Sequence, residues 1–145
     1  MIILNRDPAV AARELCDRDL RGMMKKAGNL AFKASENCSD EADLTLRWVC
    51  RSPANLKWTT DYAKECEAEL TYRFGNRLSA VAQRVLRLPD IQAGPIGSLP
   101  SEPRMWRDHY RRWVAPKSIW PDLLWKKRYP PDWLATIIFP DAAHY

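Results

Sequence analysis

The chain has 145 residues, of which 46% are apolar and 28% charged, and this length suits one domain with a single hydrophobic core. No apolar run approaches the roughly 18 residues of a membrane span, and the opening residues lack the pattern of a secretory signal, so we expect a cytoplasmic protein without membrane contact. The net charge of +5 lies in residues 101–131, where eight basic and three acidic residues leave the rest of the chain neutral. Five of the seven Trp lie in or just beyond this stretch, at Trp106, Trp113, Trp120, Trp125 and Trp133.

The first helical segment is predicted to begin at Asp7-Pro8, where an N-cap residue precedes a proline at the first helical position. Apolar residues then recur close to the helical period through the stretch that follows. We expect Asp17 or Gly22 to divide this stretch into two helices. Residues 35–41 are polar and unpatterned, which predicts a loop.

A central helix of about twenty residues is predicted from Ser52-Pro53, a second cap-plus-proline start, to Gly75, a typical C-terminal stop. Asn55 stands at the acceptor position of a capping box. The apolar positions of this helix step by four, at Ala54, Trp58, Tyr62, Cys66, Leu70 and Phe74.

The last third is predicted to alternate short helices with irregular chain. A shorter helix runs over 78–88, and residues 89–103 hold four Pro and two Gly, so they cannot form a regular element. Residues 104–114 are helical in pattern, and an apolar segment follows at 133–139. We therefore predict an all-α, compact, single-domain helical bundle over 1–145, in which the basic, Trp-rich segment 104–145 wraps the other helices.

The cysteines and histidines do not form a metal-binding pattern. The four Cys are widely spaced without a C-x-x-C motif, and both His lie far from them in sequence, so we predict neither a metal site nor a cofactor. Reduced, mostly buried cysteines are expected in a cytoplasmic protein. These residues are Cys16, Cys38, Cys50, Cys66, His109 and His144.

One face of the central helix carries polar residues, because steps of seven and four return Asn55, Tyr62, Glu69 and Arg73 to the same side. Glu69 and Arg73 form an i,i+4 acid–base pair. If this face is solvated, the pair is an ordinary surface ion pair. If it is enclosed, the four side chains form a polar network suited to a base or phosphate, and Arg77 adds a second cation beyond the helix end.

Two basic regions are candidates for phosphate contact. The first helical segment carries Lys25 and Lys26 in a mixed-charge stripe that is otherwise typical of a solvated face. The last third alternates aromatic and cationic residues, a chemistry with which nucleic-acid binders neutralise phosphates and stack on bases. Alternatively, most Trp belong to the core and the basic side chains extend past them to solvent.

The string that runs from Trp48 through Ser52 and Asn55 to Trp58, followed by Glu69-x-x-Tyr72-Arg-Phe-Gly, resembles a family of short phage-encoded proteins with the pattern W-x-x-x-S-x-x-N-x-x-W and E-x-x-Y-R-[FY]-G. Asp7-Pro8, Cys16-Asp17 and residues 125–133 match further pieces of that pattern. The resemblance implies a viral origin and a location in the cytoplasm of the infected bacterial host.

Residues 14–20 are also similar to the opening helix of the phage pyrimidine-dimer DNA glycosylases. That likeness implies a small all-α domain that flips a base out of damaged duplex and stabilises the sugar cation with a glutamate. Lys26 stands here at the position of that glutamate, so we assign the catalytic acid to Glu69 or Asp17.

The resulting hypothesis is a phage DNA-handling protein that binds DNA and, as an enzyme, excises or modifies a base. Two alternatives stay open: a non-catalytic phage protein that sequesters a host protein or a small nucleotide signal, and a minor virion or assembly component. Apart from the two acids, the predicted binding residues are Lys25, Lys26, Trp48, Ser52, Asn55, Trp58, Tyr72, Arg73, Arg77, Arg111, Arg112, Lys126, Lys127 and Arg128.

Overall fold

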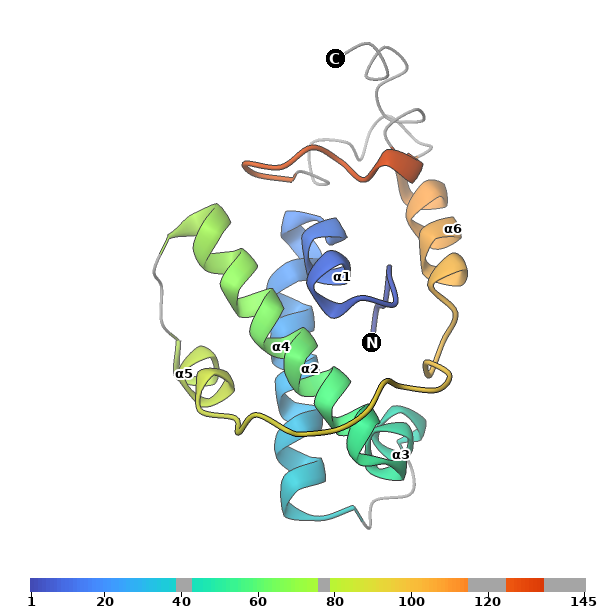
Figure 1. The fold of residues 1–145 in the computed structure, drawn as a ribbon. Coiled ribbons are helices and arrows are strands. Elements are labelled where there is room, and N and C mark those ends of the chain that lie inside the picture. The colour runs from blue at the N-terminus through green and yellow to red at the C-terminus, as the bar shows by residue number, and fades with distance from the viewer. Residues whose placement is uncertain (39–42, 76–78, 115–124, 135–145) are drawn as a thin grey trace.

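Helices make up the fold, as predicted, and no strand occurs in the residues that the computed structural model describes, which are 1–38, 43–75, 79–114 and 125–134. The two longest helices, α2 and α4, pack side by side at the centre, α1 packs on α4, and both α3 and α5 contact the central pair (Figure 1). The helices are α1 (Pro8–Glu14), α2 (Asp17–Glu36), α3 (Leu44–Arg51), α4 (Pro53–Phe74), α5 (Ala80–Leu86) and α6 (Pro103–Val114).

The helix boundaries follow from capping chemistry. Asp7 accepts hydrogen bonds from two backbone amides at the start of α1, and Ser52 accepts one from the Asn55 amide at the start of α4, as the sequence predicts. Gly75 ends α4 with a φ of 82°, a conformation that other residues rarely adopt. The side chain of Asn55 does not complete the predicted capping box, because its amide instead donates to the Trp48 carbonyl at 2.7 Å.

The structure decides between the two predicted break points of the first helical segment. Leu15 and Cys16 are extended and separate α1 from α2, which begins at Asp17, whereas Gly22 lies inside α2. The prediction of a loop over 35–41 is wrong at its start, since α2 continues to Glu36. Helix α3 was not predicted from the sequence, although Asp43 provides its N-cap by accepting from two backbone amides.

The core lies between α2 and α4 and takes in the first residues of the chain. Ile3 and Leu4 are fully buried, and the Tyr62 hydroxyl of α4 donates to the Ile2 carbonyl at 2.6 Å. Helix α5 approaches α2 closely at Gly28, where a Cβ atom would lie 2.7 Å from the Val85 side chain. Any larger residue at this position would therefore push the two helices apart.

The Pro-rich segment of residues 89–102, called the strap below, is irregular as predicted and crosses from α5 past α3 to α6, which begins at Pro103, the last residue of the predicted irregular stretch (Figure 1). The Trp48 indole donates to the Ser98 carbonyl at 2.8 Å, and the Arg6 guanidinium donates to two carbonyls of the strap at 2.6 and 2.7 Å. Lys64 of α4 forms an ion pair with Asp90 at 3.0 Å. These polar contacts hold the strap against the helices, although the strap itself forms neither a helix nor a strand.

Residues 125–134 return to the helices at the end of the central pair where α1 lies (Figure 1). The Trp125 indole is buried and donates to the Glu14 carbonyl at 2.9 Å, and the Trp133 indole donates to the Glu14 carboxylate. The wrap that the sequence predicts is therefore present over these residues. Trp120 and most of the predicted 133–139 segment lie outside the described residues.

The cysteines differ from the prediction. Cys38 and Cys50 form a disulfide that ties the end of α2 to α3, with 5.7 Å between their Cα atoms, whereas Cys16 and Cys66 are free and buried. Spacing along the chain gave no sign of this bond, because the two residues meet only through the packing of α3 on α2. In the described part of the chain, no helix combines the length and apolar character of a transmembrane segment.

Candidate functional site

The polar face predicted on α4 exists and is enclosed rather than solvated. Asn55, Tyr62, Glu69 and Arg73 are all buried, and the Arg73 side chain is 0% exposed. The Arg73 Nε atom donates to Glu69 Oε1 at 2.9 Å, which confirms the i,i+4 pair. Enclosure strengthens this pair, because little water competes for the charges.

The remaining donors of Arg73 reach the junction between α1 and α2. One terminal nitrogen donates to the Leu15 carbonyl at 2.7 Å and to Asp17 at 3.0 Å, and the other donates to the Arg13 carbonyl at 2.8 Å. These carbonyls belong to the last turn of α1 and the residue after it, where the helix supplies no N–H donors for them. Arg73 therefore holds together the ends of three helices.

Arg128 closes the other side of Glu69. Its Nε and a terminal nitrogen donate to the two Glu69 carboxylate oxygens at 2.8 and 3.0 Å, and its guanidinium lies 4.2 Å from the centre of the Tyr72 ring. The backbone amide of Lys126 donates to both carboxylate oxygens of Asp17 at 3.1 and 3.2 Å. We call Asp17, Glu69, Arg73 and Arg128 the buried ion-pair network.

Electrostatics keep the network charged. Burial raises the pKa of Glu69, but the hydrogen bonds from Arg128 and Arg73 outweigh burial and lower it below its usual value. The hydrogen bond to Glu69 raises the pKa of Arg128. Glu69 is thus an ionised carboxylate with both oxygens engaged, which is the opposite of the protonated state that a general acid requires.

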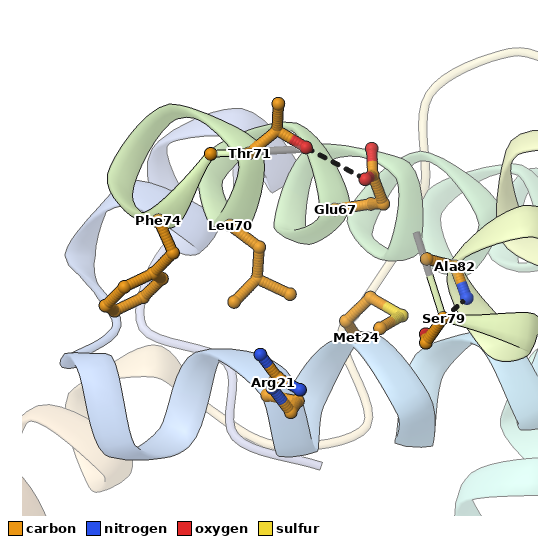
Figure 2. Close-up of a pocket in the computed structure, with 9 residues that line it drawn as sticks. Arg21, Met24, Glu67, Leu70, Thr71, Phe74, Ser79 and Ala82 are labelled. Carbon is orange, nitrogen blue, oxygen red and sulfur yellow. Dashed lines mark hydrogen bonds between the residues drawn. The ribbon is translucent and has the colours of Figure 1, made fainter. Parts of the chain in front are cut away.

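Glu69 is 4% exposed and is not among the residues that line the hollow on this side of α4. The nearest hollow lies between α2, α4 and the start of α5, and its volume of about 20 Å³ corresponds to roughly one water molecule (Figure 2). It is lined by Arg21, Met24, Glu67, Leu70, Thr71, Phe74, Gly75, Ser79 and Ala82. The polar atoms of Glu69 and Arg73 are thus engaged by protein partners within the network.

The predicted base-stacking residues are also core residues. Trp48 and Trp58 are each 5% exposed, lie edge to face 6.2 Å apart, and donate their indole N–H groups to backbone carbonyls. Asn55 and Ser52 serve the junction of α3 and α4 as described above. All four predicted binding residues therefore have partners within the fold. Neither Trp48 nor Trp58 leaves a ring face open to a base.

A different arrangement of charge lies on the solvent side of α2. Arg18, Arg21 and Lys25 are three and four positions apart, and this spacing places them on one face of the helix. Asp17 and Asp19 are the only acids in the first turn, and they are engaged by Arg73 and by the Tyr110 hydroxyl at 2.7 Å. We call this surface the basic face of α2; it consists of the exposed residues Arg18, Arg21, Lys25, Lys26 and Lys33.

Most of these cations have no acidic partner among the described residues. Arg18 lies 3.7 Å from Asp19, and no ion pair involves Arg21, Lys25, Lys26 or Lys33 in that part of the chain. Gly22 sits among them, exposed and with open space around its Cβ position. Arg18 and Arg21 were missed as binding residues, although their helical spacing from Lys25 was a usable signal.

The other predicted cations divide between paired and free. Arg111 forms an ion pair with Asp108 at 2.7 Å, while Lys127 donates its ammonium to the Tyr72 carbonyl at 2.9 Å. Lys126 is exposed and its ammonium lies 5.3 Å from the centre of the Phe74 ring, next to the start of α2. Arg112 is exposed, and Arg77 lies outside the described residues.

The structure offers no grouping of three or more His, Cys, Asp or Glu side chains for a metal ion within the described ranges. No family model matches the chain, and no curated protein and no solved structure matches it either. The similarity to short phage proteins and to the glycosylases therefore stays a prediction.

Proposed function

We propose that the protein binds double-stranded DNA by its phosphate backbone, through the basic face of α2 and the adjoining Lys126. The observation that carries this proposal is a row of exposed cations along one helix in which no acid follows Asp19, the partner of Arg18, up to Lys33. At 1.5 Å per residue the row is about 22 Å long, which allows contacts to several phosphates along a duplex groove. At the middle of the row Gly22 presents no side chain, so a phosphate can approach the helix backbone there.

The proposal is one of binding and does not include base excision. Asp17 and Glu69, the two predicted acids, are occupied by Arg73 and Arg128 and do not line the hollow beside Arg21. A flipped base needs a pocket with polar partners for its edge, and the known hollow beside Arg21 holds about one water molecule. The phage DNA-handling hypothesis is thus retained in its non-catalytic form.

The test is fluorescence anisotropy with a labelled duplex of random sequence across a series of salt concentrations. If about five phosphates are contacted, log K falls against log salt with a slope of roughly −4 to −5. The double variant K25Q/K26Q should reduce that slope by about 2. It should keep the wild-type free energy of unfolding, because neither side chain forms an ion pair within the described residues.

The matched control is R87Q/R104Q, which removes the same charge from exposed positions on other elements. It should leave the slope within about 0.5 of the wild-type value. Absence of measurable binding, a salt-independent affinity, or an equal effect of both double variants would each refute the proposal. Stronger binding to single-stranded RNA than to the duplex would also count against it.

A further inference from the structure

The Cys38–Cys50 disulfide lies on the surface. Cys38 is exposed and Cys50 is half-buried, and together they line an open hollow of about 530 Å³ at the end of α2. A sulfur that is reachable from solvent can be attacked by a thiolate, whereas an enclosed disulfide is protected. Access therefore distinguishes this bond from a purely structural crosslink.

Two arginines of α3 line the same hollow. Arg47 and Arg51 are one helical turn apart, both exposed, and neither forms an ion pair with any described residue. Positive charge beside a cysteine favours its thiolate form and attracts anionic reactants. The hollow thus combines an accessible disulfide with a binding surface for carboxylates.

We propose that Cys38 and Cys50 form a reversible redox site that exchanges with small anionic thiols of the glutathione class, whose carboxylates are bound by Arg47 and Arg51. The inference is independent of DNA binding, since the cations it uses lie on α3 and not on α2.

The exchange proceeds in two balanced steps. The thiolate of the small molecule attacks Sγ of Cys38, the more exposed of the two residues; a new S–S bond forms, the Cys38–Cys50 bond breaks, and Cys50 leaves as a thiolate that takes a proton from water. A second small thiolate then attacks the sulfur of the bound molecule and releases Cys38 as a thiolate, which is also protonated. Two small thiols are oxidised to one disulfide while the protein disulfide gains two electrons.

Exchange at this site changes how α3 is attached. The bond joins the end of α2 to α3, and α3 holds the strap through the Trp48 indole and Ser98. Reduction removes the covalent tie and leaves α3 held by its packing alone. Thiol exchange therefore acts on α3, the helix whose Trp48 side chain is hydrogen-bonded to the strap.

The experiment compares the rates at which reduced glutathione and the uncharged thiol 2-mercaptoethanol reduce the oxidised protein, with free thiols alkylated and counted by mass spectrometry. The ratio of the two rates should fall about fivefold in R47Q/R51Q at low salt, the effect of losing one favourable charge contact in water. The control R87Q/R104Q should keep the wild-type ratio.

In the wild-type protein, high salt should lower the ratio toward that of R47Q/R51Q. An unchanged ratio in R47Q/R51Q, or an equal fall in the control, would overturn the proposal. So would failure of the protein to form the Cys38–Cys50 bond in excess oxidised glutathione. Circular dichroism of each variant verifies that it is folded.

Discussion

The charges of the buried ion-pair network are matched one against another, whereas those of the basic face of α2 are not. Arg73 is fully enclosed and each of its nitrogens donates to a carbonyl or carboxylate. Lys25 and Lys26, less than three helical turns from Asp17, are exposed and have no acidic partner among the described residues. The two sets adjoin on α2, since Asp17 of the network and the lysines of the basic face both belong to that helix.

The difference separates charges that stabilise the fold from charges that are available to a partner. A buried charge without partners costs several kcal/mol, so the network satisfies its members internally and has nothing left for a ligand. An exposed row of like charges repels itself and contributes nothing to folding. The phosphate backbone that we propose as a partner would supply the opposite charge that this face lacks.

The largest expected effect is that of R73M. Removing the guanidinium leaves Glu69 and Asp17 buried or half-buried with fewer partners, and frees the carbonyls of Arg13 and Leu15. The free energy of unfolding should fall by about 3–5 kcal/mol, as measured by urea denaturation. A loss below about 1 kcal/mol would show that Arg73 is not the centre of a packed network.

A smaller effect is expected of R128M. The Arg128 side chain is 32% exposed, so water screens its two hydrogen bonds to Glu69 and compensates in part for their loss. We expect a decrease of about 1 kcal/mol in the free energy of unfolding, in the same denaturation experiment. Equal effects of R73M and R128M would contradict the ranking by burial.

Acid should weaken the network through Glu69. Because the pKa of Glu69 is lowered in the folded protein below its ordinary value of about 4.5, its contribution to stability is present above about pH 4.5 and is lost as the pH falls through the folded pKa. Unfolding measured from pH 6 to pH 3 should therefore show a decrease that is shallower in E69Q. Identical pH profiles of the wild-type protein and E69Q would show that Glu69 does not contribute to the pH dependence of stability.

Much of the helical arrangement could be predicted from local signals. The Asp7-Pro8 and Ser52-Pro53 starts and the Gly75 stop are confirmed, because capping depends on a few neighbouring residues. Helix α3 was missed because it is short and follows a polar stretch, although Asp43 followed by apolar Leu46 and Val49 was a usable pattern. Short helices draw their stability from packing that the sequence does not display.

The candidate site was predicted only in part. The sequence indicates that Glu69 and Arg73 share a helix face, but whether that face is solvated depends on partners 56 to 60 positions away. Those partners include backbone carbonyls, which carry no sequence signal at all. The Cys38–Cys50 bond was unpredictable for a related reason, since it depends on how α3 packs against α2.

The most direct test of the account is a lysine footprint of the wild-type protein with and without a duplex, by acylation with an amine-reactive reagent and mass spectrometry. Lys25, Lys26 and Lys126 should become several-fold less reactive when DNA is bound, while Lys57 and Lys64 of α4, which form ion pairs with Asp61 and Asp90, should not change. Equal protection of all five lysines, or protection confined to Lys57 and Lys64, would contradict binding through the basic face of α2.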